Sequence, residues 1–367
     1  MAEKKILMIS NVTLGLFSFR RELIARLCEQ YDVIIAAKDN GKREELEALG
    51  CTFLETNVDS RGTNPLHDLK TYLFYRKLMK TIRPDVVLTY TIKPNIYGGI
   101  ASARLHLPVI ANITGLGDAI ENKGLLSSFT RRLYRFGLKK ASRVFFQNRT
   151  NCEFFQKHHL YSGEYDILPG SGVNLSRFVS APYPPLDEDH PLTLTVVGRI
   201  TRDKGIREIL AAAHALQGQR LEIRLIGDCQ DSFLEAVREA EQEGIVHYYG
   251  RQTNMQDWYQ SSHAILHASY HEGMSNALLE AAACGRPVLA TNVPGCRETY
   301  ADGVSGFGFP PRDSEAIAQT ILRFLQLPYG EKIRMGLAGR KLVEASFDRS
   351  IVIEKYLSAI NEIWRCK

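Results

Sequence analysis

The sequence predicts an α/β protein of two doubly wound domains, each a mostly parallel sheet with helices on both faces. Its 367 residues exceed the usual size of a single hydrophobic core. Short runs rich in β-branched residues alternate with amphipathic helical patterns in both halves, which is typical of βαβ units. A proline-rich, acidic stretch at residues 179–191 interrupts this alternation once and is interpreted as an interdomain linker.

The first half predicts an N-terminal Rossmann-like domain over residues 1–178. Its expected strands are residues 5–10, 32–37, 52–55, 85–90, 108–114 and 143–147, and its expected helices are residues 17–30, 42–49, 66–82 and 127–140. Ligands of such sheets bind at the carboxyl ends of the strands, so the loops that follow the strands are the first places to look for function.

After the linker the alternation restarts and predicts a second Rossmann-like domain over residues 192–348. Its expected strands are residues 192–197, 221–226, 246–249, 264–268 and 287–290, and its expected helices are residues 206–216, 232–243 and 314–327. Residues 349–367 are expected to form a terminal helix that packs back on the first domain.

The composition is that of a soluble protein, with 44% hydrophobic and 24% charged residues. Its seven cysteines are scattered without zinc-like spacing, which favours a reducing cytosol. They are Cys28, Cys51, Cys152, Cys229, Cys284, Cys296 and Cys366. The first apolar run is too short for a signal peptide, and no run reaches the length of a membrane-spanning helix.

Positive charge is concentrated in the first half of the chain. One cluster spans residues 70–83, and a second, interleaved with aliphatic and aromatic residues, spans residues 131–143. A helix of this kind can lie on an anionic membrane surface. The alternative is the solvated face of an ordinary amphipathic helix, and the sequence leaves both open. No aromatic platform accompanies the charge, so nucleic acid is not expected as a partner.

The segment from His271 to Glu280 is the most informative part of the chain. It leads from an expected strand into an expected helix, so the backbone N–H groups of Met274, Ser275 and Asn276 lie at a helix N-terminus, which attracts phosphate. Glu272 lies in the turn before the helix. Glu280 lies about one turn inside it, roughly 6 Å along the axis.

Carboxylates on either side of a phosphate site predict a particular ligand. They repel phosphate but accept hydrogen bonds from hydroxyl groups. A molecule with phosphate in the middle and hydroxyl-rich rings at both ends fits this pattern, and a nucleotide sugar is such a molecule.

A second candidate follows the expected strand at residues 192–197. Gly198 permits a tight exit from that strand, and Arg199 and Lys204 then place two cations at its carboxyl end. Such a pair can neutralise a diphosphate leaving group. Two unrelated surface cations are the alternative interpretation.

In the first domain, the loops after the strands supply further candidates. Gly15 leaves room for a ligand near the backbone, and Arg20 is a candidate contact to an anionic acceptor. Lys93 and Thr114 belong to the loops after two later strands. Gly115 and Gly117 form only a fragment of a dinucleotide-binding pattern. Asp-x-Asp and phosphate-loop patterns are absent, so neither a metal nor a cofactor is expected.

Two further features are expected to be mainly structural. The segment Val293–Glu298, with its Pro-Gly pair, and the stretch Asp302–Gly306 are predicted to be turns. Of the histidines at positions 263, 267 and 271, only His271 is expected to lie at the site.

Taken in order, these segments resemble the retaining GT-B glycosyltransferases of the large "family four" group. The matching features are Gly198-Arg199 with Lys204-Gly205, Glu272 followed by Glu280, Gly285-x-Pro287-Val288, and Asp302-Gly303 with Gly306. Gly172-Val173-Asn174 before the linker also fits. The resemblance covers essentially the whole chain and implies two Rossmann-like domains that face a central cleft.

The resemblance also implies a role for each candidate. Arg199 and Lys204 are the expected diphosphate clamp, and Glu280 the expected ribose ligand. Glu272 is the expected contact to the donor sugar, and the amides from Met274 to Asn276 are expected to face the phosphates. One departure is that many family members carry a histidine in a first-domain loop near the donor sugar, whereas these loops carry Tyr90, Thr91, Lys93, Thr114 and Asp118.

Within the family, the chain resembles bacterial enzymes that extend undecaprenyl-diphosphate-linked saccharides, including N-acetylgalactosaminyltransferases. The implied activity is metal-independent, retaining transfer of a hexose or N-acetylhexosamine from a UDP-sugar to such an acceptor. The implied place is the cytoplasm, peripherally at the inner face of the membrane. A UDP-sugar epimerase of the same fold and a non-catalytic nucleotide-sugar-binding protein are the alternatives.

Overall fold

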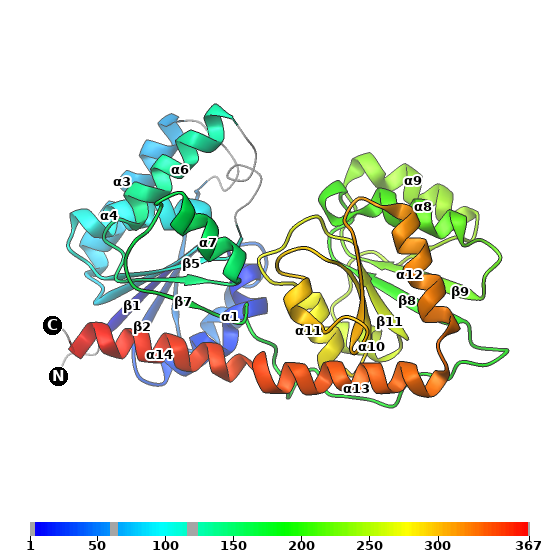
Figure 1. Cartoon of the computed structure of the whole chain (residues 1–367). Coiled ribbons are helices and arrows are strands. Elements are labelled where there is room, and N and C mark those ends of the chain that lie inside the picture. Colours follow the sequence, from blue (N-terminus) through cyan, green and yellow to red (C-terminus); the bar gives the residue numbers. More distant parts are fainter. Residues whose placement is uncertain (1–3, 59–64, 116–123, 366–367) are drawn as a thin grey trace. The chain divides into compact units, whose positions relative to one another are not determined.

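The computed structural model describes residues 4–58, 65–115 and 124–365, which fall into two compact units. Unit 1 comprises residues 1–171 and 350–367, and unit 2 comprises residues 172–349. Each unit contains a parallel sheet with helices on both faces, which confirms the predicted α/β class (Figure 1). Gly117, Asp118 and Cys366, named above, lie outside the described residues.

In the described part of unit 1, seven parallel strands form a sheet in the order β3-β2-β1-β4-β5-β6-β7. The strands are β1 Lys5–Val12, β2 Asp32–Lys38, β3 Thr52–Glu55, β4 Val86–Tyr90, β5 Val109–Ile113, β6 Arg143–Phe146 and β7 Tyr165–Ile167. The direction of strand order reverses between β1 and β4. This is the switch point at which doubly wound sheets bind ligands.

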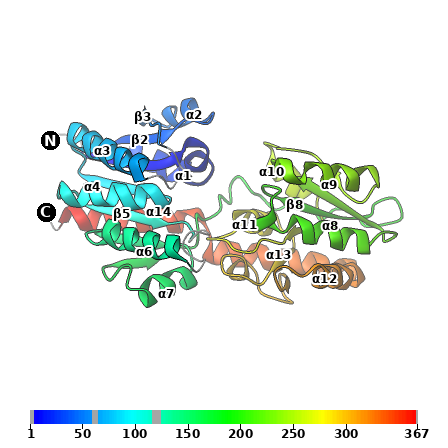
Figure 2. The same cartoon turned by 90° about the horizontal axis from the view of Figure 1, so that it is seen from above.

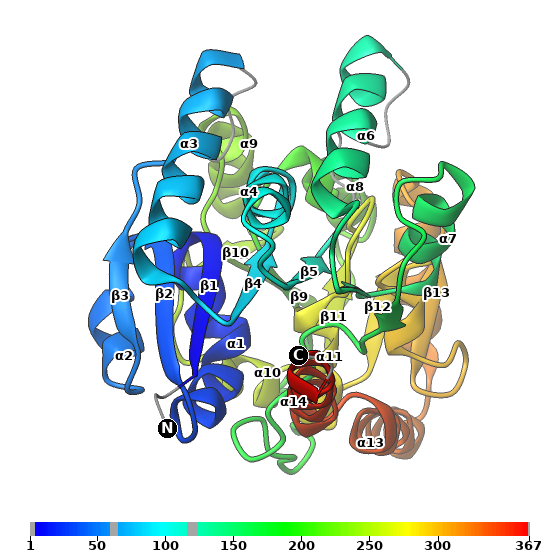
Figure 3. The same cartoon turned by 90° about the vertical axis from the view of Figure 1, so that its left-hand side faces the viewer.

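Two helical layers cover the sheet of unit 1. One layer contains α1 (Thr13–Cys28), α2 (Arg43–Glu47) and α14 (Arg349–Arg365), and buried Val352, Tyr356 and Ile360 of α14 complete its core. The other layer contains α3 (Pro65–Ile82), the π-helix η1 (Pro94–Gly98), α4 (Gly99–Arg104), α6 (Leu125–Leu138) and α7 (Arg149–Lys157). Within this layer α4 contacts both α3 and α6, as Figure 3 shows.

In unit 2, six parallel strands form a sheet in the order β10-β9-β8-β11-β12-β13 within the described chain. The strands are β8 Leu192–Val197, β9 Leu221–Ile226, β10 His247–Tyr248, β11 Ala264–His267, β12 Val288–Thr291 and β13 Gly306–Phe309. The switch point here lies between β8 and β11.

The helices of unit 2 also form two layers, one above and one below its sheet in Figure 1, and Figure 2 views the same helices from above. One layer contains α8 (Ile206–Ala215), α9 (Asp231–Gln242) and α12 (Ser314–Gln326). The other contains α10 (Met255–Gln260), α11 (Asn276–Ala283) and α13 (Tyr329–Ser346). Two 3-10 turns, η2 (Arg202–Lys204) and η3 (Arg297–Thr299), follow β8 and β12.

The segment at residues 179–191, which the composition predicts to be a linker, belongs to unit 2 and is held against the other elements of that unit. The buried guanidinium of Arg286 donates hydrogen bonds to the carbonyl oxygens of Ala181 at 3.1 Å, Pro182 at 2.8 Å and Gln260 at 2.7 Å. Nearby, the hydroxyl of Tyr183 donates to the carbonyl oxygen of His263 at 2.5 Å.

None of the helices in the described ranges is both long and apolar enough to cross a lipid bilayer.

Candidate functional site

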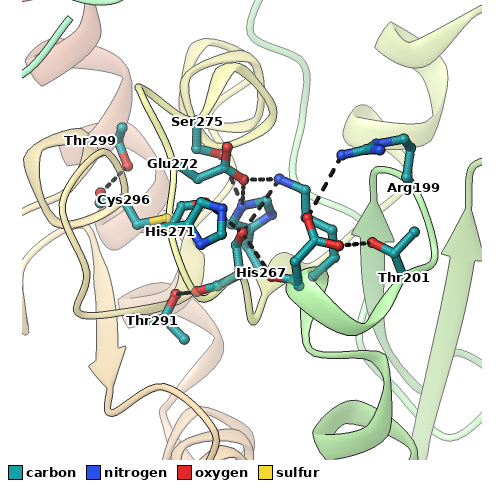
Figure 4. Close-up of polar contacts among 12 residues, drawn as sticks. Arg199, Thr201, His267, His271, Glu272, Ser275, Thr291, Cys296 and Thr299 are labelled. Carbon is teal, nitrogen blue, oxygen red and sulfur yellow. Dashed lines mark hydrogen bonds and ion pairs between the residues drawn. The ribbon is translucent and has the colours of Figure 1, made fainter. Parts of the chain in front are cut away.

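The segments that carry most of the predicted site residues leave the sheet of unit 2 side by side. Strands β8 and β11 are parallel neighbours, with Leu194 paired to Ala264 and Thr195 to Ile265. Residues 198–205 follow β8 and residues 268–275 follow β11, so both loops emerge at the carboxyl edge of the switch point. Figure 4 shows the side chains that meet there.

Lys204 and Glu272 form an ion pair between these two loops. The ammonium group of Lys204 donates to Oε1 of Glu272 and lies 3.4 Å from the hydroxyl oxygen of Ser269. The side chains of Lys204 and Glu272 are only 21% and 16% exposed. A carboxylate this buried is costly unless it has hydrogen-bond partners, so the contact stabilises both loops.

His267 is a second partner of Glu272. Its Nε2 lies 3.0 Å from Oε1 of Glu272, and its side chain is 7% exposed. His267 is the last residue of β11, and strand alternation places it on the same face as Ile265, toward α11. The sequence predicts a structural role for His267, and the alternation of β11 is the local signal that places it beneath the helix.

These contacts fix the charge of Glu272. Burial on its own would raise the pKa of this carboxyl group, but the hydrogen bond with His267 and the charge of Lys204 outweigh it and hold the pKa well below its usual range. Glu272 is therefore ionised at neutral pH.

Across the described residues, no group of three or more His, Cys, Asp or Glu side chains is arranged to hold a metal ion.

The N-terminus of α11 lies directly beside this pair. Ser275 occupies the N-cap position, but its side chain makes no capping hydrogen bond to the helix, and its hydroxyl oxygen lies 3.2 Å from Nε2 of His267. Its backbone N–H donates to the carbonyl oxygen of Gly295 at 2.7 Å. Three amides, those of Met274, Ser275 and Asn276, are expected to face phosphate. The amide of Ser275 is already bonded within the protein. Asn276 begins the first turn of the helix, and the N–H groups of a first turn have no intrahelical partners.

Arg199 is the exposed cation of the site. Its side chain is 57% exposed, and its guanidinium lies 3.7 Å from a carboxylate oxygen of Asp203. Burial alone would raise the pKa of the Asp203 carboxyl group. The hydroxyl of Thr201, which donates to it at 2.6 Å, and the charges of Lys204 and Arg199 outweigh burial, so the pKa lies below its usual value. Asp203 therefore carries a negative charge that orients Arg199 without covering it.

Glu280 has a buried hydrogen-bond partner on a neighbouring helix. The hydroxyl of Tyr259, a fully buried residue of α10, donates to a carboxylate oxygen of Glu280 at 2.8 Å. Burial and the neighbouring carboxylate raise the pKa of Tyr259 far above its ordinary value, so its hydroxyl keeps its proton and remains a donor. Glu280 itself is half-buried.

The turn after β12 packs against the backbone of Glu272. Gly295 has a φ of +82°, and a Cβ atom at this position would lie 2.5 Å from the carbonyl oxygen of Glu272. Only glycine allows this approach and this backbone conformation at no cost. The predicted structural turn is therefore a direct backbone contact of Glu272.

The predicted residues of unit 1 lie at the strand ends of the other sheet. Gly15 is in the first turn of α1, and half-buried Thr114 follows β5. Arg20 is 4% exposed and lies over the ring of Tyr90, 5.5 Å from its centroid. The ammonium group of Lys93 lies 3.0 Å from a carboxylate oxygen of Asp68. Both unit 1 cations are thus largely buried, unlike Arg199.

Each unit matches a glycosyltransferase family. Residues 5–148 match the family described as glycosyl transferase 4-like, and residues 191–327 match the family described as glycosyl transferases group 1. The two ranges together span well over half of the chain.

One similar protein is N,N'-diacetylbacillosaminyl-diphospho-undecaprenol alpha-1,3-N-acetylgalactosaminyltransferase of Campylobacter jejuni. It is 23% identical over 97% of this chain and 98% of its own length. Among solved structures, a glycosyltransferase of Rickettsia africae superposes with a TM-score of 0.80 over the whole of both chains at 19% identity. The Anabaena protein HepE in complex with UDP and glucose also gives a TM-score of 0.80, over 98% of this chain and 100% of that one, at 17% identity.

The solved structures establish the fold, and the family matches on both units establish the kind of enzyme. The chain is a glycosyltransferase of the GT-B fold and belongs to the large family-four group.

Proposed function

We propose that this enzyme transfers a hexose or N-acetylhexosamine from a UDP-sugar to a saccharide carried on undecaprenyl diphosphate, with retention at the anomeric carbon and without a metal ion. The observation that carries the proposal is the meeting of Lys204 and Glu272 beside the first turn of α11. A cation and the first-turn N–H groups of a helix suit a diphosphate, and a carboxylate held ionised beside them suits a sugar hydroxyl.

In this proposal the donor's diphosphate contacts Arg199, Lys204 and the first turn of α11. Glu280, oriented by Tyr259, accepts hydrogen bonds from the ribose hydroxyls, and Glu272 accepts one from the donor sugar. Uridine as the nucleoside of the donor is supported by the UDP bound to the Anabaena protein of the same fold. Because Lys204 pairs with Glu272 in the structure, binding exchanges that carboxylate for phosphate at the ammonium group.

The proposed chemistry is a front-face displacement. The bond between the anomeric carbon and the β-phosphate oxygen breaks while the acceptor hydroxyl oxygen bonds to that carbon on the same face. The proton of the hydroxyl passes to the departing phosphate oxygen. Arg199, Lys204 and the amides of α11 stabilise the negative charge that develops on the leaving diphosphate.

The acceptor is inferred from the full-length relative. The name of the Campylobacter jejuni enzyme places its acceptor saccharide on diphospho-undecaprenol, and the similarity covers both units rather than the donor half alone. Assembly of a bacterial surface polysaccharide or glycan is the corresponding role for this chain.

A lipid-linked acceptor requires contact with a membrane, and unit 1 carries a surface suited to it. Leu66, Leu69 and Leu73 of α3 are 70%, 54% and 49% exposed, and Phe129 and Phe136 of α6 are 53% and 56% exposed. Both sets recur at helical spacing, so each forms a stripe. Exposed cations flank them, namely Lys70, Lys77 and Lys80 on α3, and Arg132 and Arg135 on α6.

This combination of exposed apolar stripes and cations is typical of helices that lie peripherally on anionic lipid. We therefore place the enzyme in the cytoplasm, at the inner face of the cell membrane.

The donor and acceptor are tested by a screen of nucleoside-diphosphate sugars with undecaprenyl-linked saccharides present and absent. Release of UDP that depends on the acceptor is expected. Arg199→Ala should lower kcat/KM about 100-fold or more, whereas Arg334→Ala, a control at a 71% exposed position on α13, should not. Epimerised nucleotide sugar formed without any acceptor would favour the epimerase, and near-normal turnover of Arg199→Ala would contradict the clamp.

Membrane contact is tested separately by co-sedimentation with vesicles of phosphatidylglycerol or of phosphatidylcholine. Wild-type protein is expected to bind the anionic vesicles, and Phe129→Ser with Phe136→Ser should abolish most of this binding. Tyr249→Ser replaces an exposed aromatic residue of unit 2 and serves as the control. Equal binding by the two variants would refute the assignment of the surface.

A further inference from the structure

His267 is the side chain that contacts both Glu272 and the N-cap residue of α11. Its Nε2 lies 3.0 Å from Oε1 of Glu272 and 3.2 Å from the hydroxyl oxygen of Ser275. It comes from the end of β11, beneath the helix, and is nearly buried. Neither the family resemblance nor the matched relatives assign a role to this residue.

The chemistry of the three groups fixes where the hydrogens lie. An ionised carboxylate can only accept hydrogen bonds, so Nε2 of His267 carries a hydrogen, whether or not the ring is charged. The hydroxyl oxygen of Ser275 therefore faces an N–H group, and its own hydrogen points elsewhere.

This contact also explains an uncapped helix. A serine at the N-cap ordinarily accepts a hydrogen bond from an N–H group of the first turn, but the side chain of Ser275 does not. With its oxygen turned toward His267, the first-turn N–H groups of α11 stay available to a ligand.

His267 also reduces the energetic cost of separating Lys204 from Glu272 when a donor binds. In the structure the buried carboxylate of Glu272 has the ammonium group of Lys204 as a partner. If Lys204 turns to a diphosphate, the carboxylate loses that partner while it remains buried. The N–H group of His267 stays in place and continues to satisfy it, which lowers the cost of releasing Lys204.

We propose that His267 is a positioning residue of the donor site. Its Nε2–H holds Glu272 and draws Ser275 away from the helix, so that Lys204 and the first-turn amides of α11 can engage the diphosphate of the donor. This inference rests on the proposed function and assigns to His267 no contact with the donor itself.

The test compares two substitutions of His267. His267→Gln keeps an N–H group at about the reach of Nε2, whereas His267→Leu keeps the bulk and removes the donor. UDP affinity is measured by calorimetry, with KM and kcat for the donor sugar. His267→Leu should weaken UDP binding and raise KM about tenfold, the loss expected for one to two hydrogen bonds, with a smaller effect on kcat. His267→Gln should remain within about threefold of wild type.

His214→Leu is the matched control, because His214 is half-exposed on α8 and pairs only with Glu243 at 3.7 Å among the contacts of the described chain. It should leave the affinity for UDP unchanged. If His267→Leu binds UDP as tightly as wild type, or if the glutamine variant is no better than the leucine variant, His267 is a core residue and the proposal is wrong.

A second measurement uses wild-type protein and does not depend on the stability of any variant. Nitrogen-15 NMR of the histidine side chains reports which ring nitrogen carries the hydrogen, and His267→Gln identifies the signal. A hydrogen on Nε2 is expected, and an Nδ1–H tautomer would overturn the proposal. If wild-type protein failed to bind UDP but showed the Nε2 hydrogen, the donor assignment would fail while the contact itself stood.

Discussion

Gly295→Ala tests whether the turn after β12 sets the position of Glu272. The added Cβ would lie 2.5 Å from the carbonyl oxygen of Glu272 and 2.7 Å from its carbon, both shorter than the 3.0 Å that such contacts allow. An alanine at a φ of +82° costs about 1 kcal/mol in backbone strain. Separating the two backbones costs about 2 kcal/mol more, by analogy with overpacked cores.

Gly303→Ala isolates the steric part of this cost. Gly303 has a φ of +72°, close to that of Gly295, but a Cβ atom there would meet no atom within 4 Å. The control should therefore lower the free energy of unfolding by about 1 kcal/mol, and Gly295→Ala by about 3 kcal/mol. For a unit of this size these values correspond to roughly 2–4 °C and 6–12 °C in Tm.

The assay combines thermal unfolding with UDP binding by calorimetry. Because Ser275 donates its backbone N–H to Gly295 and Glu272 lies against the same turn, displacement of the turn moves both residues. Gly295→Ala should weaken UDP binding about tenfold, whereas Gly303→Ala should not change it. Equal Tm shifts for the two variants with unchanged UDP affinity would show that this turn does not set the position of Glu272.

Three further predictions concern other contacts of unit 2. Tyr259→Phe removes the donor 2.8 Å from Glu280 and should weaken UDP binding about tenfold in calorimetry with little change in kcat, while an unchanged affinity would argue against Glu280 as ribose ligand. Glu272→Gln should destabilise the protein at pH 7. The pKa of Glu272 is depressed, so its stabilisation is complete above its unfolded pKa of about 4.3 and declines as the pH falls toward the folded value. Urea unfolding measures the free energy of unfolding of both proteins. The difference between wild type and variant should narrow by about 1 kcal/mol from pH 5 to pH 3.5, and a constant difference would contradict the pairing of Glu272. Arg286→Met should cost about 3 kcal/mol and expose residues 179–186 to proteolysis, while Arg334→Ala should do neither.

Periodicity predicted most of the fold because long amphipathic patterns have few other solutions. The elements it missed are short or contain unusual residues. Among the described residues they include η1, η2, η3, α4, α7, β7, α10 and α13. Helix α13 contains Gly330, Gly336 and Gly339, which disfavour a helix. The packing of α13 on the turn before β12 stabilises it despite these glycines. Gly336 permits that close packing, since a Cβ atom there would lie 2.1 Å from the carbonyl oxygen of Gly285.

The geometry of the candidate site was predictable where its residues are close in sequence. The turn from Glu272 to Asn276 and the cations at 199 and 204 follow strands, and strand ends are where ligands bind. The contacts of Tyr259 with Glu280 and of Gly295 with Glu272 join separate elements, and no spacing in a single sequence encodes them. The sequence indicates on which face of β11 His267 lies. Its contacts with Glu272 and Ser275 depend on how α11 packs, which the sequence pattern does not give.

The path of the chain has a consequence for how the protein is made. Unit 2 is a continuous insertion whose ends meet, since the N–H group of Val173 donates to the carbonyl of Phe347 at 2.8 Å and that of Arg349 to the carbonyl of Val173 at 3.1 Å. Unit 1 needs Tyr356 and Ile360 of α14 to fill its core. During synthesis, the part of unit 1 that precedes unit 2 is therefore translated first but completed last. A nascent chain that lacks α14 holds all the residues of unit 2 but an incomplete core in unit 1.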